Sequence, residues 1–88
     1  MELKELKEFM KEIGFKVLEF EEPIFDFFGR YKGFEIYGCF EIENDKISYS
    51  LYFTDVSKDI EYGAMIGKIS ADKESVMELI EPDFFNLN

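Results

Sequence analysis

The chain has 88 residues, 47% of them hydrophobic and 18% aromatic, and its 20 acidic and 10 basic side chains give a formal net charge of -10. This length suits one domain spanning residues 1–88, and the aromatic content supports a packed core, which excludes a disordered acidic tail. The excess of carboxylates argues against direct binding to nucleic acid or anionic membranes, because that affinity comes from Lys and Arg, and it favours a basic protein partner.

The sequence also bears on the compartment of the protein. No segment approaches the roughly 18 apolar residues of a membrane span. The start of the chain lacks the positively charged n-region and the apolar h-region that are typical of a signal peptide. A single cysteine excludes an internal disulfide bond and fits a reducing compartment. We therefore expect a cytoplasmic protein.

The first predicted element is an amphipathic N-terminal helix. Its apolar residues recur at helical spacing: Leu3, Leu6, Phe9, Met10 and Ile13. Gly14 follows as a natural C-terminal cap. Lys and Glu fill the remaining positions, so we expect the apolar side of this helix to pack on the core.

From Phe15 onward the apolar residues alternate with a period of two, which predicts strands. The five expected ranges are approximately 15–20, 24–29, 33–43, 46–54 and 60–69. A two-residue loop at 44–45 puts Ile42 opposite Ile47 and Tyr37 opposite Tyr52. Every apolar residue of this hairpin then has an apolar or glycine partner on the same face, so the register is well specified.

The two neighbouring hairpins are predicted in the same way. A turn at Tyr31-Lys32, or a four-residue loop at 30–33, puts Phe27 opposite Ile36. A six-residue loop at 54–59 produces two apolar pairs, namely Phe53 with Ile60 and Ile47 with Ile66. Arg30 and Lys32, at the turn around Tyr31-Lys32, are interpreted as solvated turn residues. The alternative is that this turn is a ligand-binding loop.

A second helix is predicted at about 72–81, with Asp72 as its N-cap and Pro82 after its end. The tail beyond it carries three apolar residues: Phe84, Phe85 and Leu87. We expect the tail to pack on its own domain, with docking on a partner as the alternative. The predicted fold class is α+β, a single-domain antiparallel β-meander of four to five strands with an N-terminal and a C-terminal helix packed on one face.

Strict alternation divides this sheet into two predicted faces. The covered face holds an apolar set: Phe25, Phe27, Phe34, Ile36, Phe40, Ile42, Ile47, Tyr49, Leu51, Phe53, Ile60, Tyr62 and Ile66. The open face holds the alternate set: Asp26, Phe28, Glu35, Tyr37, Cys39, Glu41, Ser48, Ser50, Tyr52, Thr54, Glu61 and Met65. Glu19 joins this set if the first strand pairs with the second as expected. Carboxylates surround Tyr37 and Tyr52 and no cation is expected in the middle, which is closer to a protein interface than to a solvated face. An ordinary polar face is the alternative.

A second acidic feature lies on the C-terminal helix. Glu74, Glu78 and Glu81 follow one helical stripe, which we call the acidic ridge. Like charges at this spacing repel, and carboxylates near the C-terminal end oppose the helix dipole. The ridge is therefore a second candidate contact surface, with a solvated face as the alternative.

The sequence contains no catalytic or metal-binding pattern. Histidine is absent, and Cys39 lies in mid-strand without a base. Asp26 and Glu35 are diagonal neighbours at roughly 7–8 Å, but an open sheet lacks the cleft that glycosidase chemistry needs. We expect no enzyme activity, no cofactor and no metal.

These observations favour a non-enzymatic binding protein that blocks a basic, nucleic-acid-binding surface of a partner protein, as a nucleic-acid mimic or an inhibitor of phage, anti-defence or immunity type does. The predicted contact residues lie on the two acidic surfaces: Asp26, Glu35, Tyr37, Glu41, Tyr52, Glu61, Glu74, Glu78 and Glu81. The alternative is a self-associating structural or chaperone-like subunit that uses the aromatic part of the open face or the tail. The expected state is a monomer or a dimer.

Overall fold

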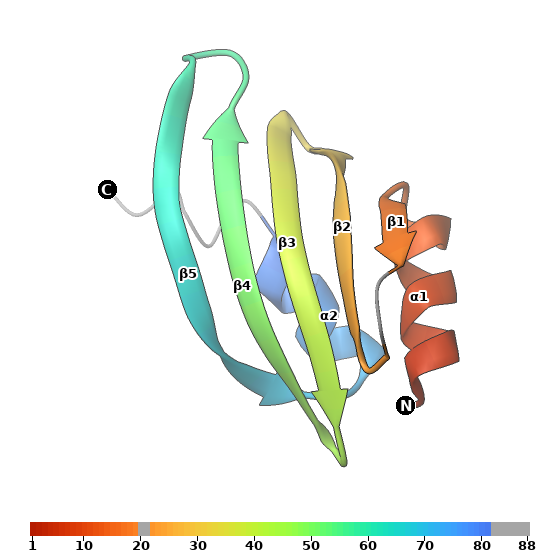
Figure 1. The fold of residues 1–88 in the computed structure, drawn as a ribbon. Helices are drawn as coiled ribbons and strands as arrows, with labels where there is room; N and C mark the ends of the chain where they lie inside the picture. The colour runs from red at the N-terminus through yellow and green to blue at the C-terminus, as the bar shows by residue number, and fades with distance from the viewer. Residues whose placement is uncertain (20–21, 82–88) are drawn as a thin grey trace.

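An N-terminal helix, five antiparallel strands and a C-terminal helix follow one another along the chain in the computed structural model (Figure 1). The structure describes residues 1–19 and 22–81. Its elements are α1 (Leu3–Glu12), β1 (Lys16–Glu19), β2 (Ile24–Tyr31), β3 (Phe34–Glu43), β4 (Lys46–Asp55), β5 (Ile60–Ser70) and α2 (Lys73–Ile80). The predicted α+β meander is confirmed, and the predicted packing of the tail lies outside the described residues.

Local sequence signals set the ends of both helices. α1 stops before Gly14, whose φ of 108° lies in the left-handed region that favours glycine. α2 starts after Asp72, whose carboxylate accepts a hydrogen bond from the backbone N–H of Ser75 at 2.7 Å. Among the described residues, neither helix has the length and apolar run that crossing a membrane would need.

The core lies between the sheet and the two helices, which pack on the same face. Both helices bury apolar residues in one cluster with the inward side chains of the strands: Leu6, Met10, Val76, Leu79 and Ile80. Aromatic rings fill the centre, where Phe15 meets Phe27 edge-on at 5.4 Å and Phe25 meets Phe40 edge-on at 5.9 Å between ring centroids. One face of the sheet is therefore covered and the other is left open.

The hairpin between β3 and β4 has the predicted register. Ile42 pairs with Ile47, and Tyr37 pairs with Tyr52. The two-residue turn places Asn44 at φ 57°, a conformation that Asn adopts more easily than most residues. Hydrophobic alternation and turn chemistry agree here.

The hairpin between β2 and β3 is shifted by two residues from its predicted register. Phe27 pairs with Gly38, not with Ile36, and the turn is Lys32-Gly33. Both turn residues have positive φ, 49° and 87°, as a type I′ hairpin turn requires. A shift of two residues keeps every side chain on its predicted face, so the division into faces is unaffected by this error.

The pairing of β4 with β5 departs further from the prediction, because β5 contains a β-bulge. Phe53 pairs with Tyr62 and Leu51 pairs with Met65, so β5 has one more residue than β4 between these two pairs. The predicted pairs of Phe53 with Ile60 and of Ile47 with Ile66 are wrong. Beyond the bulge, the side chains of β5 change faces.

This change of face corrects two assignments, and the pairing of β1 corrects a third. Met65 packs against the core, whereas Ile66 lies on the open face with 81% of its surface exposed. Glu19 pairs with Phe25 of the covered face, and its carboxylate contacts the ammonium of Lys7 on α1 at 3.3 Å. Glu19 is therefore not part of the open face.

Candidate interaction surface on the open sheet face

Three aromatic side chains cross the centre of the open face in a row. Phe28 of β2 pairs with Tyr37 of β3, which pairs with Tyr52 of β4. Their exposed fractions are 46%, 45% and 51%. Within residues 1–19 and 22–81 no helix covers these side chains, because α1 and α2 pack on the opposite face (Figure 1). We call this set the aromatic row.

Aliphatic side chains extend the aromatic row toward the other end of the sheet. Leu18 of β1, Ile24 of β2 and Ile66 of β5 are exposed on the same face. Large apolar side chains that gather on one exposed surface of a small domain are typical of interaction sites. Alternation alone assigns Ile66 to the covered face. It is the bulge in β5 that turns this side chain to the open face, where it extends the apolar surface.

Asp26 connects two further side chains of the open face. The hydroxyl of Tyr37 donates a hydrogen bond to the Oδ2 of Asp26 at 2.7 Å, and this bond is the main reason why the pKa of Tyr37 is raised. Cys39 pairs with Asp26 across the strands. Burial, followed by the Asp26 and Glu41 carboxylates, raises the pKa of the Cys39 thiol to about 11. Cys39 is thus a protonated thiol at neutral pH and a poor nucleophile.

The predicted carboxylates of the open face lie at different distances from the aromatic row and differ in their surroundings. Glu35 is exposed, and its Oε1 lies 3.3 Å from the Nη2 of Arg30. Glu61 is also exposed, Glu41 is half-buried, and no ion pair to either is found within residues 1–19 and 22–81. The surface therefore offers two unneutralised carboxylates besides the hydrogen-bonded Asp26.

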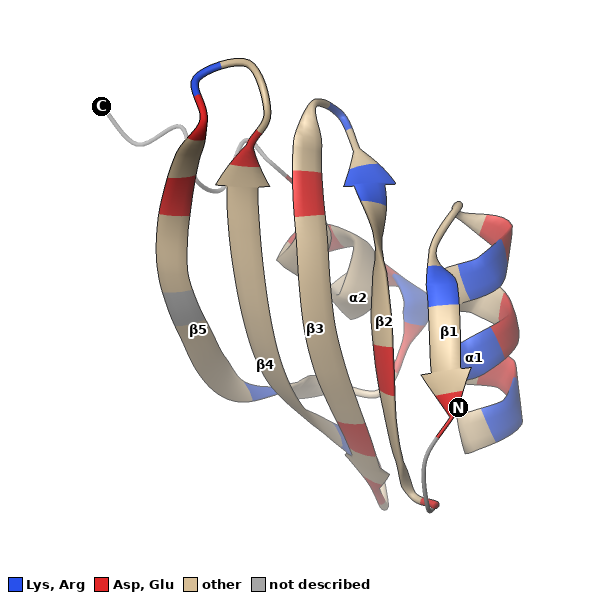
Figure 2. Cartoon of the chain, turned by 45° about the horizontal axis from the view of Figure 1, so that its top comes forward, with Lys and Arg blue, Asp and Glu red and all other residues tan. Residues whose placement is uncertain are grey.

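Cations lie at the rim of this face, close to the strand ends (Figure 2). β3 contains no Lys or Arg, and in β4 the one cation is the first residue, Lys46. Lys16 and Lys68 lie on the outer strands β1 and β5. The expected absence of cations thus holds for the middle of the face but not for its rim, and the surface is an apolar centre with a charged rim of both signs.

The acidic ridge differs from its prediction at one position. Glu74 and Glu78 are exposed. The Glu81 carboxylate accepts hydrogen bonds from the Nζ of Lys32 at 2.8 and 2.9 Å. The ridge therefore has two exposed carboxylates and a third that is held by the β2–β3 turn. Its helix lies on the covered side, so the ridge and the open face do not form one surface.

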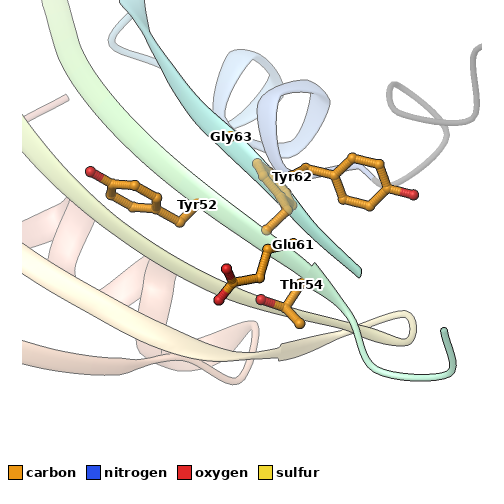
Figure 3. Close-up of a pocket in the computed structure, with 6 residues that line it drawn as sticks. Tyr52, Thr54, Glu61, Tyr62 and Gly63 are labelled. Atoms are coloured by element: carbon orange, nitrogen blue, oxygen red, sulfur yellow. The ribbon is translucent and has the colours of Figure 1, made fainter. Parts of the chain in front are cut away.

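A hollow of about 470 Å³ opens on the sheet beside Tyr52 (Figure 3). Its lining comes from β4 and from the bulge in β5: Tyr52, Phe53, Thr54, Glu61, Tyr62 and Gly63. In Figure 3 the side chains of Tyr52, Thr54 and Glu61 lie on one side of the strands, and the ring of Tyr62 points to the other. We call this feature the bulge hollow. Two of its residues, Tyr52 and Glu61, were predicted as contact residues.

Neither the described side chains nor known proteins indicate a cofactor or an enzyme class. In the described part of the chain, no three metal-ligating side chains are close enough to hold an ion. Comparison with protein families, with curated proteins and with solved structures finds no match to this chain. The chemistry of the open face is therefore the starting point for assigning a function.

Proposed function

We propose that this protein is a non-enzymatic binding protein whose open sheet face docks on a basic, nucleic-acid-binding surface of a partner protein. The observation that carries this proposal is the aromatic row, three rings about half exposed at the centre of a face that neither α1 nor α2 covers. Aromatic side chains are enriched at the centres of protein interfaces, where they bury a large area at a low entropic cost.

The charges around the aromatic row favour a basic partner. Asp26 and Glu61 neighbour the row along the strands on its two sides, and Glu41 lies farther along β3. The cations of the face lie toward the strand ends, and one of them, Lys16 on the outer strand β1, pairs with Phe28 at the end of the row. The net charge of -10 attracts basic surfaces over a longer range and raises the association rate. Carboxylates that bind the Lys and Arg side chains of the partner would occupy the groups that hold phosphate in a nucleic acid complex. Binding would therefore compete with nucleic acid.

The test is affinity capture at low and high salt, after which each captured protein is purified and its binding is measured again. We expect a basic partner whose association rate falls steeply with salt and whose binding is displaced by nucleic acid. Partners that are neutral or acidic, or rates that do not respond to salt, would contradict the proposal.

Two matched variants decide which surface makes the contact. Replacing Tyr37 and Tyr52 by Ala truncates the aromatic row, whereas replacing Glu74 and Glu78 by Gln neutralises the acidic ridge. We expect the first double variant to weaken binding at least about 10-fold, as the loss of a central aromatic contact usually does. The second should change binding only through its smaller net charge. The opposite order would move the contact surface to the ridge.

Self-association through the open face is the second candidate, and the 81% exposure of Ile66 favours it. An exposed aliphatic side chain beside the aromatic row would be buried if two copies met face to face. Light scattering at micromolar concentration separates the two candidates. A stable dimer in low salt that the Ile66→Ser variant disrupts would support self-association, and a monomer under these conditions would exclude it.

A further inference from the structure

The bulge in β5 leaves a hollow beside Tyr52 that a regular strand pairing would not leave. Across the bulge the register leaves Tyr52 of β4 without a direct partner on β5. Gly63, one of the β5 residues that line the hollow, has no side chain, and a Cβ built there would meet nothing within 4 Å. The space beside the Tyr52 ring is therefore open, and its volume of about 470 Å³ falls in the range of roughly 300–1,000 Å³ that small-ligand pockets occupy.

Three chemical groups surround this space. Tyr52 contributes an aromatic ring, Glu61 a carboxylate and Thr54 a hydroxyl, all on the open side of the strands (Figure 3). Thr54 pairs directly with Glu61, so the carboxylate and the hydroxyl are neighbours. Glu35, which pairs with Thr54 from the other side, is held by Arg30, whereas no ion pair to Glu61 is found in the described ranges. The carboxylate of Glu61 is available to an external cation.

We propose that the bulge hollow receives the guanidinium group of an arginine side chain of the partner. This inference rests on the proposed function, because it names the group on the basic surface that the open face recognises. The guanidinium would lie against the Tyr52 ring through a cation–π contact and donate two parallel hydrogen bonds to the Glu61 carboxylate. The Thr54 hydroxyl would accept a further N–H.

This arrangement prefers arginine to lysine. A guanidinium is flat and has five N–H donors in a fixed fork, so it stacks on a ring and binds a carboxylate with two bonds at once. An ammonium is a compact, strongly hydrated charge: it can sit over a ring, but it can neither stack flat on it nor bind a carboxylate through a planar fork of two bonds. A surface that recognised positive charge alone would not discriminate between the two.

The experiment uses two synthetic peptides, tetra-arginine and tetra-lysine, both acetylated at the N-terminus and amidated at the C-terminus so that their length and charge are the same. Each is titrated into the isotope-labelled protein at low salt, and the amide signals are followed by NMR. We expect the tetra-arginine peptide to bind about 10-fold more tightly, a ratio typical of one well-formed charged hydrogen-bonding contact. The largest shifts should occur at Tyr52, Thr54, Glu61 and Gly63.

Two variants with matched controls locate the binding. Glu61→Gln should weaken tetra-arginine binding about 10-fold. Glu43→Gln removes one negative charge as well, but from the far end of β3, and should change binding less than about twofold. Gly63→Val fills the hollow at a position that has room for a side chain and needs no positive φ. We expect it to abolish the preference for tetra-arginine while the urea midpoint of unfolding stays the same or rises.

Each outcome supports or overturns the inference. A preference for tetra-arginine that both Glu61→Gln and Gly63→Val remove supports it. Equal binding of the two peptides, shifts that centre elsewhere, or a preference that survives Gly63→Val overturns it but leaves the docking of a basic surface intact. If neither peptide binds in a salt-dependent way, the proposed function itself fails.

Discussion

Gly38 is the position where the packing of the covered face allows the least change. It pairs with Phe27 on one side and with Leu51 on the other, and both neighbours are fully buried. A Cβ at Gly38 would come within 2.5 Å of the Cζ of Phe27 and would also overlap the Cδ2 of Leu51. We predict that Gly38→Ala destabilises the protein by overpacking the core.

The magnitude follows from how little the ring of Phe27 can move. Its centroid lies 4.5 Å from that of Phe40 and 5.4 Å from that of Phe15. Displacing one ring in such a cluster forces its neighbours out of their preferred rotamers, which costs about 1–3 kcal/mol. Since 1 kcal/mol lowers the Tm of a domain of this size by about 4–8 °C, we expect a Tm lower by about 8–16 °C for a middle value of 2 kcal/mol.

Urea unfolding followed by far-UV circular dichroism measures this change, and Gly63→Ala is the matched control. The same methyl group at Gly63 meets open space, so we expect the free energy of unfolding to change by less than about 0.5 kcal/mol or to rise. Combining Gly38→Ala with Leu51→Ala should give a smaller loss than the sum of the two single losses, because the shortened side chain makes room for the methyl group. If Gly38→Ala is as stable as the parent, or if the two losses simply add, the packing argument is wrong.

Two further predictions concern titratable groups. The pKa of the Cys39 thiol is raised to about 11, against about 8.5 for a free thiol. We therefore expect iodoacetamide to alkylate the native protein at pH 8 far more slowly than the urea-unfolded chain, and Asp26→Asn to speed the reaction of the native protein. Equal rates for the native and the unfolded protein would contradict this prediction. The same shift predicts stability that falls as the pH rises above about 8.5, because the unfolded thiol loses its proton first. The pKa of Asp55 is lowered mainly by the hydrogen bond that the Ser57 hydroxyl donates at 2.7 Å. Ser57→Ala should therefore be less stable than the parent at pH 7, and the difference in Tm should shrink as the pH falls below about 3.9, the ordinary pKa of Asp; an unchanged difference at pH 2.5 would exclude this role.

The sequence predicts the fold well where two independent signals agree. Alternation and a two-residue loop both place Tyr37 opposite Tyr52, and the structure has this pair. In the hairpin between β2 and β3, a shift of two residues leaves all faces unchanged, so hydrophobic pattern cannot choose the register. The choice depends on which two residues accept positive φ, and these are Lys32 and Gly33.

The candidate site is only partly predictable for a different reason. Alternation assigns a face to each residue on the assumption that no residue is inserted, and the bulge breaks this assumption between Tyr62 and Met65. Gly63, inside a strand and followed by an apolar run, was the available signal, because a glycine within a strand often marks a bulge. It would have predicted that Ile66 is exposed.

The bulge also explains why the open face has two different halves. Between the bulge and the β4–β5 turn, Glu61 lies on the open face, as alternation predicts, and the bulge leaves a hollow beside Tyr52. On the other side, the added residue turns Met65 into the core and Ile66 out to solvent. A bulge of an edge strand discourages pairing with other strands, but blocking the edge does not require an exposed aliphatic side chain on the face. The exposure of Ile66 is a cost in a monomer and would be a gain in a complex, so the same inserted residue shapes both the bulge hollow and an exposed apolar side chain on the proposed docking surface.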